Sequence, residues 1–293
     1  MLTARMAKQR ENMNEKKKEK KLKKKRKKHI MHMLLLFIII SVWTWFPFTD
    51  RKVIDIPNKE VMPVKIVLIS DLHSCYYGPN QSWLIKMVDK ENPDIVLLAG
   101  DIFDDRIKDD NAVILCENLA DKYPCYYVTG NHEYWSDRED EMCTKAANAG
   151  VTVLRGDCDT ITVSGTTLDI CGVDDPDEIG LSEWKAQIDS AYAKTDDEHV
   201  KILISHRPEK VSIYEQYDFD IICSGHAHAG QIKIPWMNKG VYAPDQGFMA
   251  EYIDGEYTLS SGTILEVSRG LARESTPLPR YFNHPEIVSI EIH

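Results

Sequence analysis

Short apolar runs alternate with amphipathic stretches downstream of residue 62. Apolar runs of strand character occur at residues 64–69, 95–98, 125–128, 202–204 and 221–223. Stretches with helical periodicity lie between them or follow them, at residues 81–90, 111–121, 138–149, 183–194 and 209–216. Continuous apolar strands separated by helices are typical of α/β proteins with buried, largely parallel strands. The pattern therefore predicts an α/β fold.

Two turn signals add antiparallel pairing to this pattern. The sequence VSGT at residues 163–166 joins two β-rich runs, and Asp254 and Gly255 lie between the runs MAEYI and EYTLS. Both are typical of β-hairpins. We therefore expect a mixed sheet or a second sheet.

Residues 30–48 form an apolar segment without Asp, Glu, Lys or Arg. Nineteen helical residues extend about 28 Å, close to the roughly 30 Å of a bilayer core. Trp43, Trp45 and Phe48 gather at its far end, as in an aromatic belt, and no small-residue cleavage site follows. These features predict a basic cytoplasmic tail (1–28), an uncleaved transmembrane anchor (29–49), a linker (50–62) and an extracytoplasmic domain (63–293).

Charge divides the chain into two unlike parts. Residues 1–28 hold 14 basic and 3 acidic residues, a formal +11, and the remainder holds 22 basic and 43 acidic residues, a formal −21. The basic run fits a topology signal with attraction to anionic lipid head groups. A nucleic-acid-binding tail is the alternative, although interleaved aromatic residues are missing, and disorder is the expected state of this run. The acidic remainder lacks the basic groove that nucleic acid needs.

Seven cysteines occur without a C-x-x-C pair, which argues against a structural zinc site. We expect most of them to be buried as small apolar residues. Cys75 differs because it lies two positions beyond a candidate ligand.

Metal-binding residue types follow almost every predicted strand. In chain order they are Asp71, His73, Asp101, Asp104, Asn131, His132, Glu133, His206, His226 and His228. Because ligands collect at the carboxyl ends of strands in α/β sheets, these residues are expected to converge in one crevice. The glycines at 100, 130 and 225 fit tight turns that bring backbone close to an ion.

The ligand types indicate the chemistry. Asp, Asn and His without thiolate suit divalent Mn, Fe or Zn. One carboxylate between two ions can bridge them, and Asp101 is the central candidate. Taken alone, an Asp-x-His pair is more often a capped turn than a ligand pair. Five such motifs in this order, each after a β run, are unlikely to arise as turns.

The motifs together resemble a known family. Asp71-x-His73, Gly100-Asp101-x-x-Asp104, Gly130-Asn131-His132-Glu133, His206 and Gly225-His226-x-His228 resemble the signature of the calcineurin-like metallophosphoesterases, over residues 63–292. Flanking pieces at 172–176, 205–208, 267–271 and 283–286 are similar to the membrane-associated bacterial branch with phosphodiesterases of the YkuE and YaeI type. The chain departs from that branch at Ala227 and Ala229, in the sequence GHAHAGQ where the branch has GHTHGGQ. This departure concerns contacts near the substrate, because both histidines are retained.

The resemblance implies a four-layer αββα sandwich of two mixed sheets and a site for two ions. One ion would be held by Asp71, His73, Asp101 and His228, and the other by Asp101, Asn131, His206 and His226. The resemblance also implies that His132 stands beside the leaving group, oriented by Asp104.

These features predict a membrane-anchored phosphoesterase that cleaves phosphodiester or pyrophosphate bonds by attack of a hydroxide bridging two metals. A phosphomonoesterase and an inactive metal-binding module are the alternatives. A lipid or cell-envelope substrate and a monomer are expected. Four residues after the last motif are further candidates for substrate contact, although a surface or ion-pair role is as plausible for the arginines: Gln231, Tyr242, Arg269 and Arg280.

Overall fold

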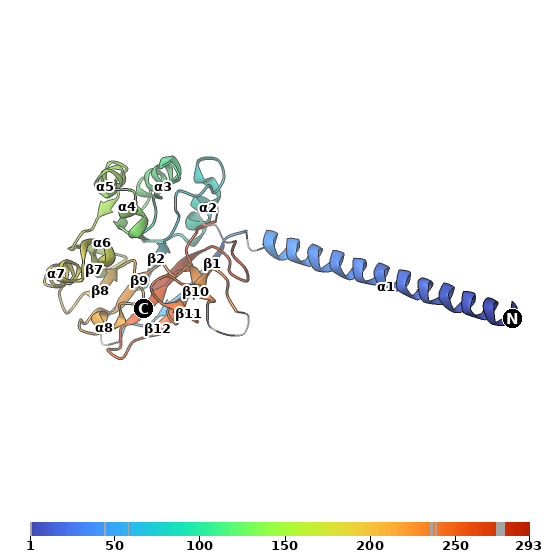
Figure 1. Ribbon diagram of the computed structural model, residues 1–293. Helices are drawn as coiled ribbons and strands as arrows, with labels where there is room; N and C mark the ends of the chain where they lie inside the picture. Colours follow the sequence, from blue (N-terminus) through green and yellow to red (C-terminus); the bar gives the residue numbers. More distant parts are fainter. Residues whose placement is uncertain (1, 44, 58, 235–236, 238, 274–278) are drawn as a thin grey trace. The chain divides into compact units, whose positions relative to one another are not determined.

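The computed structural model describes residues 2–43, 45–57, 59–234, 237, 239–273 and 279–293, with the side chains of residues 2–12 and 40–43 left out. The chain divides into two units, residues 1–43 and 44–293. Each unit has its own internal structure (Figure 1).

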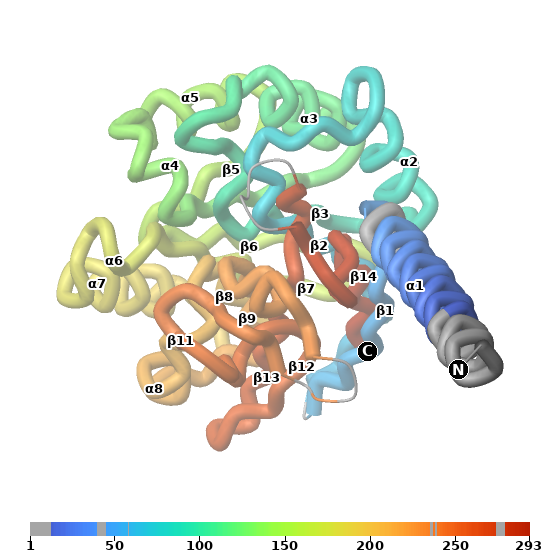
Figure 2. The backbone as a smooth tube through the Cα atoms, turned by 45° about the vertical axis from the view of Figure 1, so that its right-hand side comes forward, coloured from blue at the N-terminus to red at the C-terminus, as the bar shows by residue number. Residues whose placement is uncertain are grey.

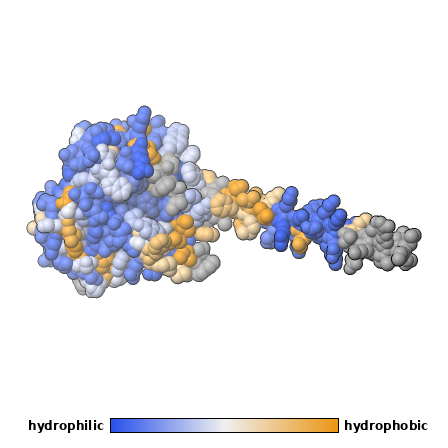
Figure 3. All heavy atoms as spheres, viewed as in Figure 1, coloured by the Kyte–Doolittle hydropathy of each residue, from blue (hydrophilic) through white to orange (hydrophobic). Residues whose placement is uncertain are grey.

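The first unit is one helix, α1 (Leu2–Trp43). The expectation of disorder in the basic run was therefore wrong. Lys, Glu, Met and Leu are strong helix formers, and Glu19 pairs with Lys23 one turn later. Figure 3 shows the hydrophilic basic stretch of α1 and its apolar stretch as separate bands.

The predicted transmembrane helix is not found. Among the residues that the structure describes, no helix has both the length and the apolar character to cross a membrane. Residues 40–44 of the predicted anchor lie outside the described side chains. The last two residues of the predicted anchor, Phe48 and Thr49, begin a strand, because Pro47 cannot continue a helix and the following residues pair with another strand.

The first sheet has the order β1-β14-β2-β3-β4-β5. Its strands are β1 (Phe48–Ile54), β2 (Val64–Ile69), β3 (Ile95–Ala99), β4 (Cys125–Val128), β5 (Thr152–Val153) and β14 (Glu286–Ile292). The pair β14–β2 is antiparallel, and the other pairs are parallel. Strand β1 runs beside β14 from Phe48 opposite Glu286, so residues 50–54 of the expected linker are part of the sheet (Figure 2).

The second sheet has the order β12-β13-β9-β8-β7-β6. Its strands are β6 (Asp157–Val163), β7 (Thr166–Gly172), β8 (Val200–Ile204), β9 (Ile221–Ser224), β12 (Gly255–Thr258) and β13 (Ile264–Val267). The β6–β7 hairpin confirms the turn predicted at residues 163–166. The turn predicted at Asp254 and Gly255 was wrong, since Gly255 begins β12 and this strand pairs with the later β13.

Helices cover the outer faces of both sheets. The helices of this unit are, in chain order, η1 (Pro79–Gln81), α2 (Ser82–Glu91), α3 (Asp110–Ala120), α4 (Asn131–Trp135), α5 (Glu139–Asn148), α6 (Pro176–Ile179), α7 (Leu181–Tyr192), α8 (Val211–Tyr214) and η2 (His228–Gly230), and the longer ones cover the sheets. Helices α2, α3 and α5 lie on one side of the strands and α7 and α8 on the other (Figure 1). A small hairpin of β10 (Tyr242–Ala243) and β11 (Gly247–Phe248) stands apart from both sheets.

Three apolar clusters hold these layers together. Along β2, Ile66 and Leu68 pack between the two sheets, whereas Val67 and Ile69 pack under the helices of the first sheet. A third cluster around Trp184 joins the second sheet to α7 and α8. Both faces of the inner strands are therefore buried, which explains their continuous apolar runs. The predicted α/β sandwich of two mixed sheets is confirmed.

Six of the seven cysteines are buried, and Cys158 is half-buried. Cys75 packs in the core of the first sheet and its helices, so it lies near a candidate ligand without being exposed. The expectation of small apolar roles for most cysteines is confirmed.

Candidate metal centre

The predicted ligands lie at the carboxyl ends of the central strands. Strand β2 leads into Asp71 and His73, β3 into Asp101, β4 into Asn131, β8 into His206, and β9 into His226 and His228. Asp71, His73, Asp101, His226 and His228 have φ between 47° and 65°. The left-handed region is costly for residues other than glycine, and such strain clusters at functional sites. The fold thus holds these side chains in place at a conformational cost.

The glycines predicted for close backbone approach have that role. A Cβ on Gly100 would lie 2.5 Å from the His206 ring, and one on Gly225 would lie 2.5 Å from the Asp71 carboxylate. A Cβ on Gly130 would collide with Asp101. At these three positions a larger residue would displace a candidate ligand.

The first ligand group consists of Asp71, His73 and His228. His228 Nε2 lies 3.1 Å from Asp71 Oδ1 and 3.4 Å from His73 Nε2. Two ligands on one ion at about 2.1 Å lie about 3.0–3.4 Å apart, so these spacings fit a shared ion. Burial lowers the pKa of His228 to about 4, which keeps its ring neutral and able to bind a metal.

The second ligand group consists of Asp101, His206 and His226, whose ligand atoms lie within 4.8 Å of one another. His206 Nε2 is 3.1 Å from Asp101 Oδ2. The Asn131 Oδ1 atom is buried and has no hydrogen-bond partner among the described residues. A buried acceptor without a donor is costly, and a cation would satisfy it. This donor set therefore fits a metal ion.

Asp101 lies between the two groups. Its Oδ2 atom is 3.7 Å from His73 Nε2 and 3.1 Å from His206 Nε2. Burial lowers the pKa of His206, but the charges of Asp101 and Asp71 raise it to about 10. The negative charges of the two carboxylates thus favour a positive charge at this position, and a divalent cation would supply it in place of a proton.

Hydrogen bonds decide which nitrogen of each ring can face an ion. His206 Nδ1 donates to the Ala99 carbonyl at 2.8 Å, and His73 Nδ1 lies 3.1 Å from Asp104 Oδ2, so Nε2 faces the centre in both rings. His226 is the reverse case. Its Nε2 is 3.0 Å from Asp245 Oδ2 and 3.1 Å from Arg207 Nη1, which leaves Nδ1 as the candidate ligand atom.

His132 lies beside both groups. Its backbone N–H donates to Asp101 at 2.9 Å, and its ring Nδ1 is 2.8 Å from Asp105 Oδ1 and 3.5 Å from Asp104 Oδ2. The Asp104 carboxylate therefore lies near both His73 and His132, and Asp105 is the nearer partner of His132. Burial lowers the pKa of His132, but the charge of Asp101 and hydrogen bonds to Asp104 and Asp105 raise it to about 9.

Glu133 has a structural role that sequence reasoning did not assign. Its buried carboxylate accepts the backbone N–H groups of Asp101 at 3.1 Å, Phe103 at 3.0 Å and Gly130 at 2.8 Å. It therefore ties the turn after β3 to the turn after β4. The sequence gives no signal for this role, because the convergence of three backbone donors on one side chain arises only in the folded chain.

Arg207 and Asp245 were also missed. The Arg207 guanidinium is buried, binds both oxygens of Asp175 at 2.6 and 2.9 Å, and pairs with Asp177 and Asp245. Asp245 lies on the turn between β10 and β11, outside the five motifs. This arginine thus joins the segments after β7 and β8 to the small hairpin.

Of the four further candidates for substrate contact, Gln231 is not among the described residues that line the cavity at the candidate centre. Tyr242 lines the cavity at the candidate centre. Arg269 pairs with Asp254, and the buried Arg280 donates to the carbonyls of Ala272 and Arg269. Neither arginine lines that cavity as described. The departing residues Ala227 and Ala229 are fully buried and do not line it either.

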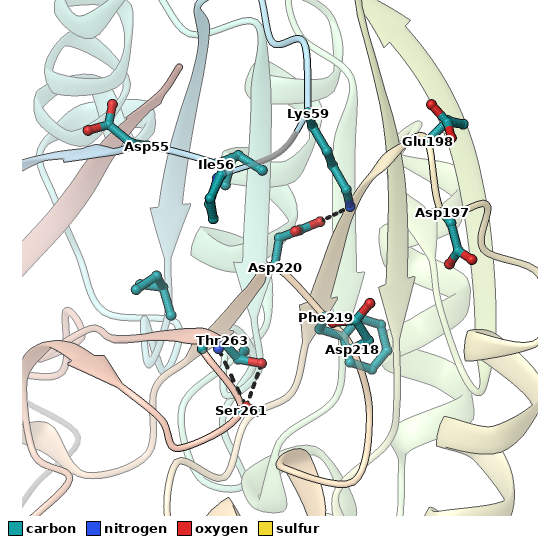
Figure 4. A pocket seen from close by; sticks show the side chains of 13 residues that line it. Asp55, Ile56, Lys59, Asp197, Glu198, Asp218, Phe219, Asp220, Ser261 and Thr263 are labelled. Carbon is teal, nitrogen blue, oxygen red and sulfur yellow. Dashed lines mark hydrogen bonds and ion pairs between the residues drawn. The ribbon is translucent and has the colours of Figure 1, made fainter.

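Two cavities lie at opposite ends of the strands. The cavity of about 290 Å³ at the carboxyl ends is lined by Asp101, Asn131, His132, His226 and His228 together with Trp135, Tyr242, Pro244 and Asp245. The other, of about 520 Å³, lies where β8, β9 and β13 begin, and there Lys59 reaches Asp220 at 2.6 Å (Figure 4). The larger cavity contains none of the predicted ligands, so size does not identify the centre.

Comparison with known proteins agrees with this geometry. The calcineurin-like phosphoesterase family matches residues 64–230. The chain is 31% identical to a metallophosphoesterase of Campylobacter jejuni, covering 82% of this chain and 61% of that protein. It is 28% identical to the metallophosphoesterase YkuE of Bacillus subtilis, covering 76% and 77%. It is 27% identical to a bovine transmembrane protein with metallophosphoesterase domain, covering 77% and 53%.

The chain spans about three fifths of the length of the Campylobacter relative. The family match covers the strands that carry all seven predicted ligands, from Asp71 to His228. The resemblance predicted from the five motifs is thereby confirmed. The chain belongs to the calcineurin-like phosphoesterase family.

Proposed function

We propose that this chain hydrolyses phosphodiester or pyrophosphate bonds with two divalent metal ions. The observation that carries the proposal is the arrangement of two ligand groups, Asp71–His73–His228 and Asp101–His206–His226, at one cavity. Asp101 lies within 3.7 Å of a histidine from each group. This arrangement supports one carboxylate shared by two ions.

The ligand chemistry supports Mn, Fe or Zn. Every candidate donor is an imidazole nitrogen or an oxygen of Asp or Asn, and thiolates do not take part. Two bound ions would supply Lewis acidity and an activated water to the reaction. The buried Asn131 Oδ1 would complete the second group.

His132 is assigned to the leaving group. Its Nδ1 is held by Asp105 and Asp104, so Nε2 is the ring atom free to face the cavity that His132 lines. The neighbouring carboxylates favour a protonated ring. His132 would therefore donate a proton, or a charged hydrogen bond, to the departing oxygen.

Activity assays on the full chain test the proposal. We would remove metal from the protein, reload it with Mn, Fe or Zn, and follow hydrolysis of bis(p-nitrophenyl) phosphate and p-nitrophenyl phosphate. Metal-restored hydrolysis of the diester is expected. Preference for the monoester would favour a phosphomonoesterase instead.

The Asp101→Ala variant separates an enzyme from an inactive metal-binding module. Loss of the shared carboxylate should reduce bound metal below two ions per chain and abolish turnover. Near-normal turnover in this variant would contradict the assignment. A wild-type chain that binds two ions but cleaves neither ester under any metal would support the inactive module.

Membrane attachment through α1 is a separate proposal. It is supported by the exposed apolar side chains of Ile30, Met31 and residues 33–39, and by the name of the bovine relative. The whole domain would then lie outside the cytoplasm, with a lipid or envelope substrate. Alkaline extraction of cell membranes tests attachment, and protease treatment of intact cells tests orientation. Release of the protein from membranes by alkali would contradict attachment. Protection of the domain from protease until the cells are lysed would contradict its position outside the cytoplasm.

A further inference from the structure

The cavity at the candidate centre has two chemically different parts. The part formed by Asp101, Asn131, His226 and His228 carries candidate metal ligands. The other part has an apolar surface formed by Trp135, Tyr242 and Pro244. Trp135 belongs to α4, whereas Tyr242 belongs to β10, so two segments more than 100 positions apart in sequence build this surface.

Trp135 is exposed but held in a defined orientation. Its side chain is 55% exposed, and its indole Nε1 donates to Glu178 Oε1 at 2.8 Å. Its ring lies 4.6 Å from the His132 ring, centroid to centroid. An indole fixed by a hydrogen bond loses little conformational entropy when a ligand packs on it. Trp135 is therefore pre-oriented to contact a ligand group that lies next to His132.

Tyr242 provides a second aromatic face at the same cavity. It is 50% exposed, and its ring lies 5.4 Å from the ring of Phe248, its partner across the β10–β11 hairpin. Arg207 holds the turn of this hairpin through Asp245. The hairpin that carries Tyr242 is thus bound to Arg207, whose Nη1 also lies 3.1 Å from Nε2 of His226.

The charges of the cavity restrict what can bind there. None of the described residues that line it is a lysine or an arginine, and Asp101 and Asp245 contribute carboxylates. The candidate ions could balance one phosphate group, but a second phosphate beyond them would meet carboxylates and aromatic rings. The surface therefore suits an uncharged ester group better than a polyphosphate.

We propose that Trp135 and Tyr242 form a subsite for an uncharged, apolar ester group of the substrate, either a ring or a hydrocarbon chain. This inference rests on the proposed function and narrows it to single phosphodiesters with such a group. Phosphorus would lie at the candidate ions, and the apolar group would pack against the indole of Trp135 and the phenol of Tyr242.

Binding measurements test the subsite independently of turnover. The metal-loaded full chain would be titrated calorimetrically with diphenyl phosphate and with dimethyl phosphate, which have the same charge. Aromatic contacts predict that diphenyl phosphate binds roughly tenfold more tightly. Trp135→Ala and Tyr242→Ala should each remove most of this preference, and Trp135→Phe should retain part of it.

Trp83→Ala is the matched control, because Trp83 is 51% exposed and does not line the cavity. It should leave the ratio of the two affinities unchanged. Equal affinity of wild type for the two diesters, or a ratio unaffected by both cavity variants, would overturn the subsite. Since the readout is binding, a failure of hydrolysis would count against the proposed function and not against the subsite.

Discussion

Asp245 Oδ2 lies 3.0 Å from His226 Nε2, although the two residues are separated by 19 positions and by the η2 turn. Asp245 also accepts a hydrogen bond from Arg207. A carboxylate only accepts, so the contact with Asp245 favours a proton on Nε2 of His226, whereas Arg207 Nη1, 3.1 Å from the same nitrogen, can only donate. The hydrogen bond from His226, together with the charge of Arg207, outweighs partial burial and lowers the pKa of Asp245 to about 2. Asp245 thereby favours the tautomer in which His226 Nδ1 can bind an ion.

Asp245→Asn should weaken metal binding. An amide can present its N–H to His226 Nε2, which would move the ring proton to Nδ1 and remove the ligand lone pair. Loss of such a partner typically costs about 10–100-fold in metal affinity. Competition with a chelator, measured at each of the two ions, checks this value.

Asp177→Asn is the control for this change. Asp177 and Asp245 are both 40% exposed and both bind Arg207, but Asp177 has no contact with His226. Metal affinity should be unchanged in this variant. A similar loss in both variants would mean that Arg207, rather than the His226 contact, is responsible.

His132→Ala should lower kcat for diester hydrolysis by about 10²–10⁴-fold, the usual contribution of a positioned acid or base. Two bound ions should remain, because His132 is outside both proposed ligand sets. Asp105→Asn should give a smaller loss, since Asp104 still lies 3.5 Å from the same ring nitrogen. Metal analysis alongside the kinetics checks this, and a loss of bound metal in His132→Ala would contradict its assignment to the leaving group.

Gly270→Ala should disturb the candidate metal site in addition to straining the backbone. Gly270 has φ +70°, and an added Cβ would lie 2.5 Å from the Cβ of Asp71. Gly262 has φ +93° and open space around it. Both changes should cost about 1–2 kcal/mol of unfolding free energy from the left-handed backbone.

Only Gly270→Ala should also reduce metal affinity, because it displaces Asp71. Denaturant unfolding and metal titration of the two variants separate the two effects. Equal metal affinity in both would mean that the Asp71 turn adjusts to the extra methyl group.

The stability of the metal-free protein should fall as pH rises from about 5 to about 8 because of Glu266. Its two carboxylate oxygens are buried without hydrogen-bond partners among the described residues. Burial raises its pKa from 4.5 to about 8. Between these pH values the folded chain keeps a proton that the unfolded chain has released, so the free energy of unfolding decreases with pH.

Glu266→Gln should flatten this slope, measured by urea unfolding across the same pH range. Some slope should remain, since burial also raises the pKa of Glu286 to about 7. Glu183→Gln is the control, because Glu183 is exposed on α7 and does not contribute to the raised pKa of Glu266. A slope unchanged by Glu266→Gln would show that this carboxyl group does not titrate in the window.

The local pattern of apolar residues predicted the central strands β2 and β4 correctly, but it did not predict the edge strand β1. The runs at 64–69 and 125–128 match β2 and β4 to the residue, because strands buried on both faces leave an uninterrupted apolar signal. Strand β1 was read as part of an anchor and a linker. Its pairing with β14 depends on a partner more than 200 positions away, which local pattern does not encode.

The sequence by itself determined the candidate ligand types, their order after the strands, and the family, because these are properties of short motifs. It also indicated the three glycines that lie against ligands. Only the tertiary structure decided which nitrogen of each histidine faces the centre, since that depends on partners such as Ala99 and Asp245 that reach the rings from other segments. The aromatic surface of Trp135 and Tyr242 was decided in the same way. Hydrogen bonds and packing between residues distant in sequence arise from the folded arrangement of both sheets, and no local pattern records them.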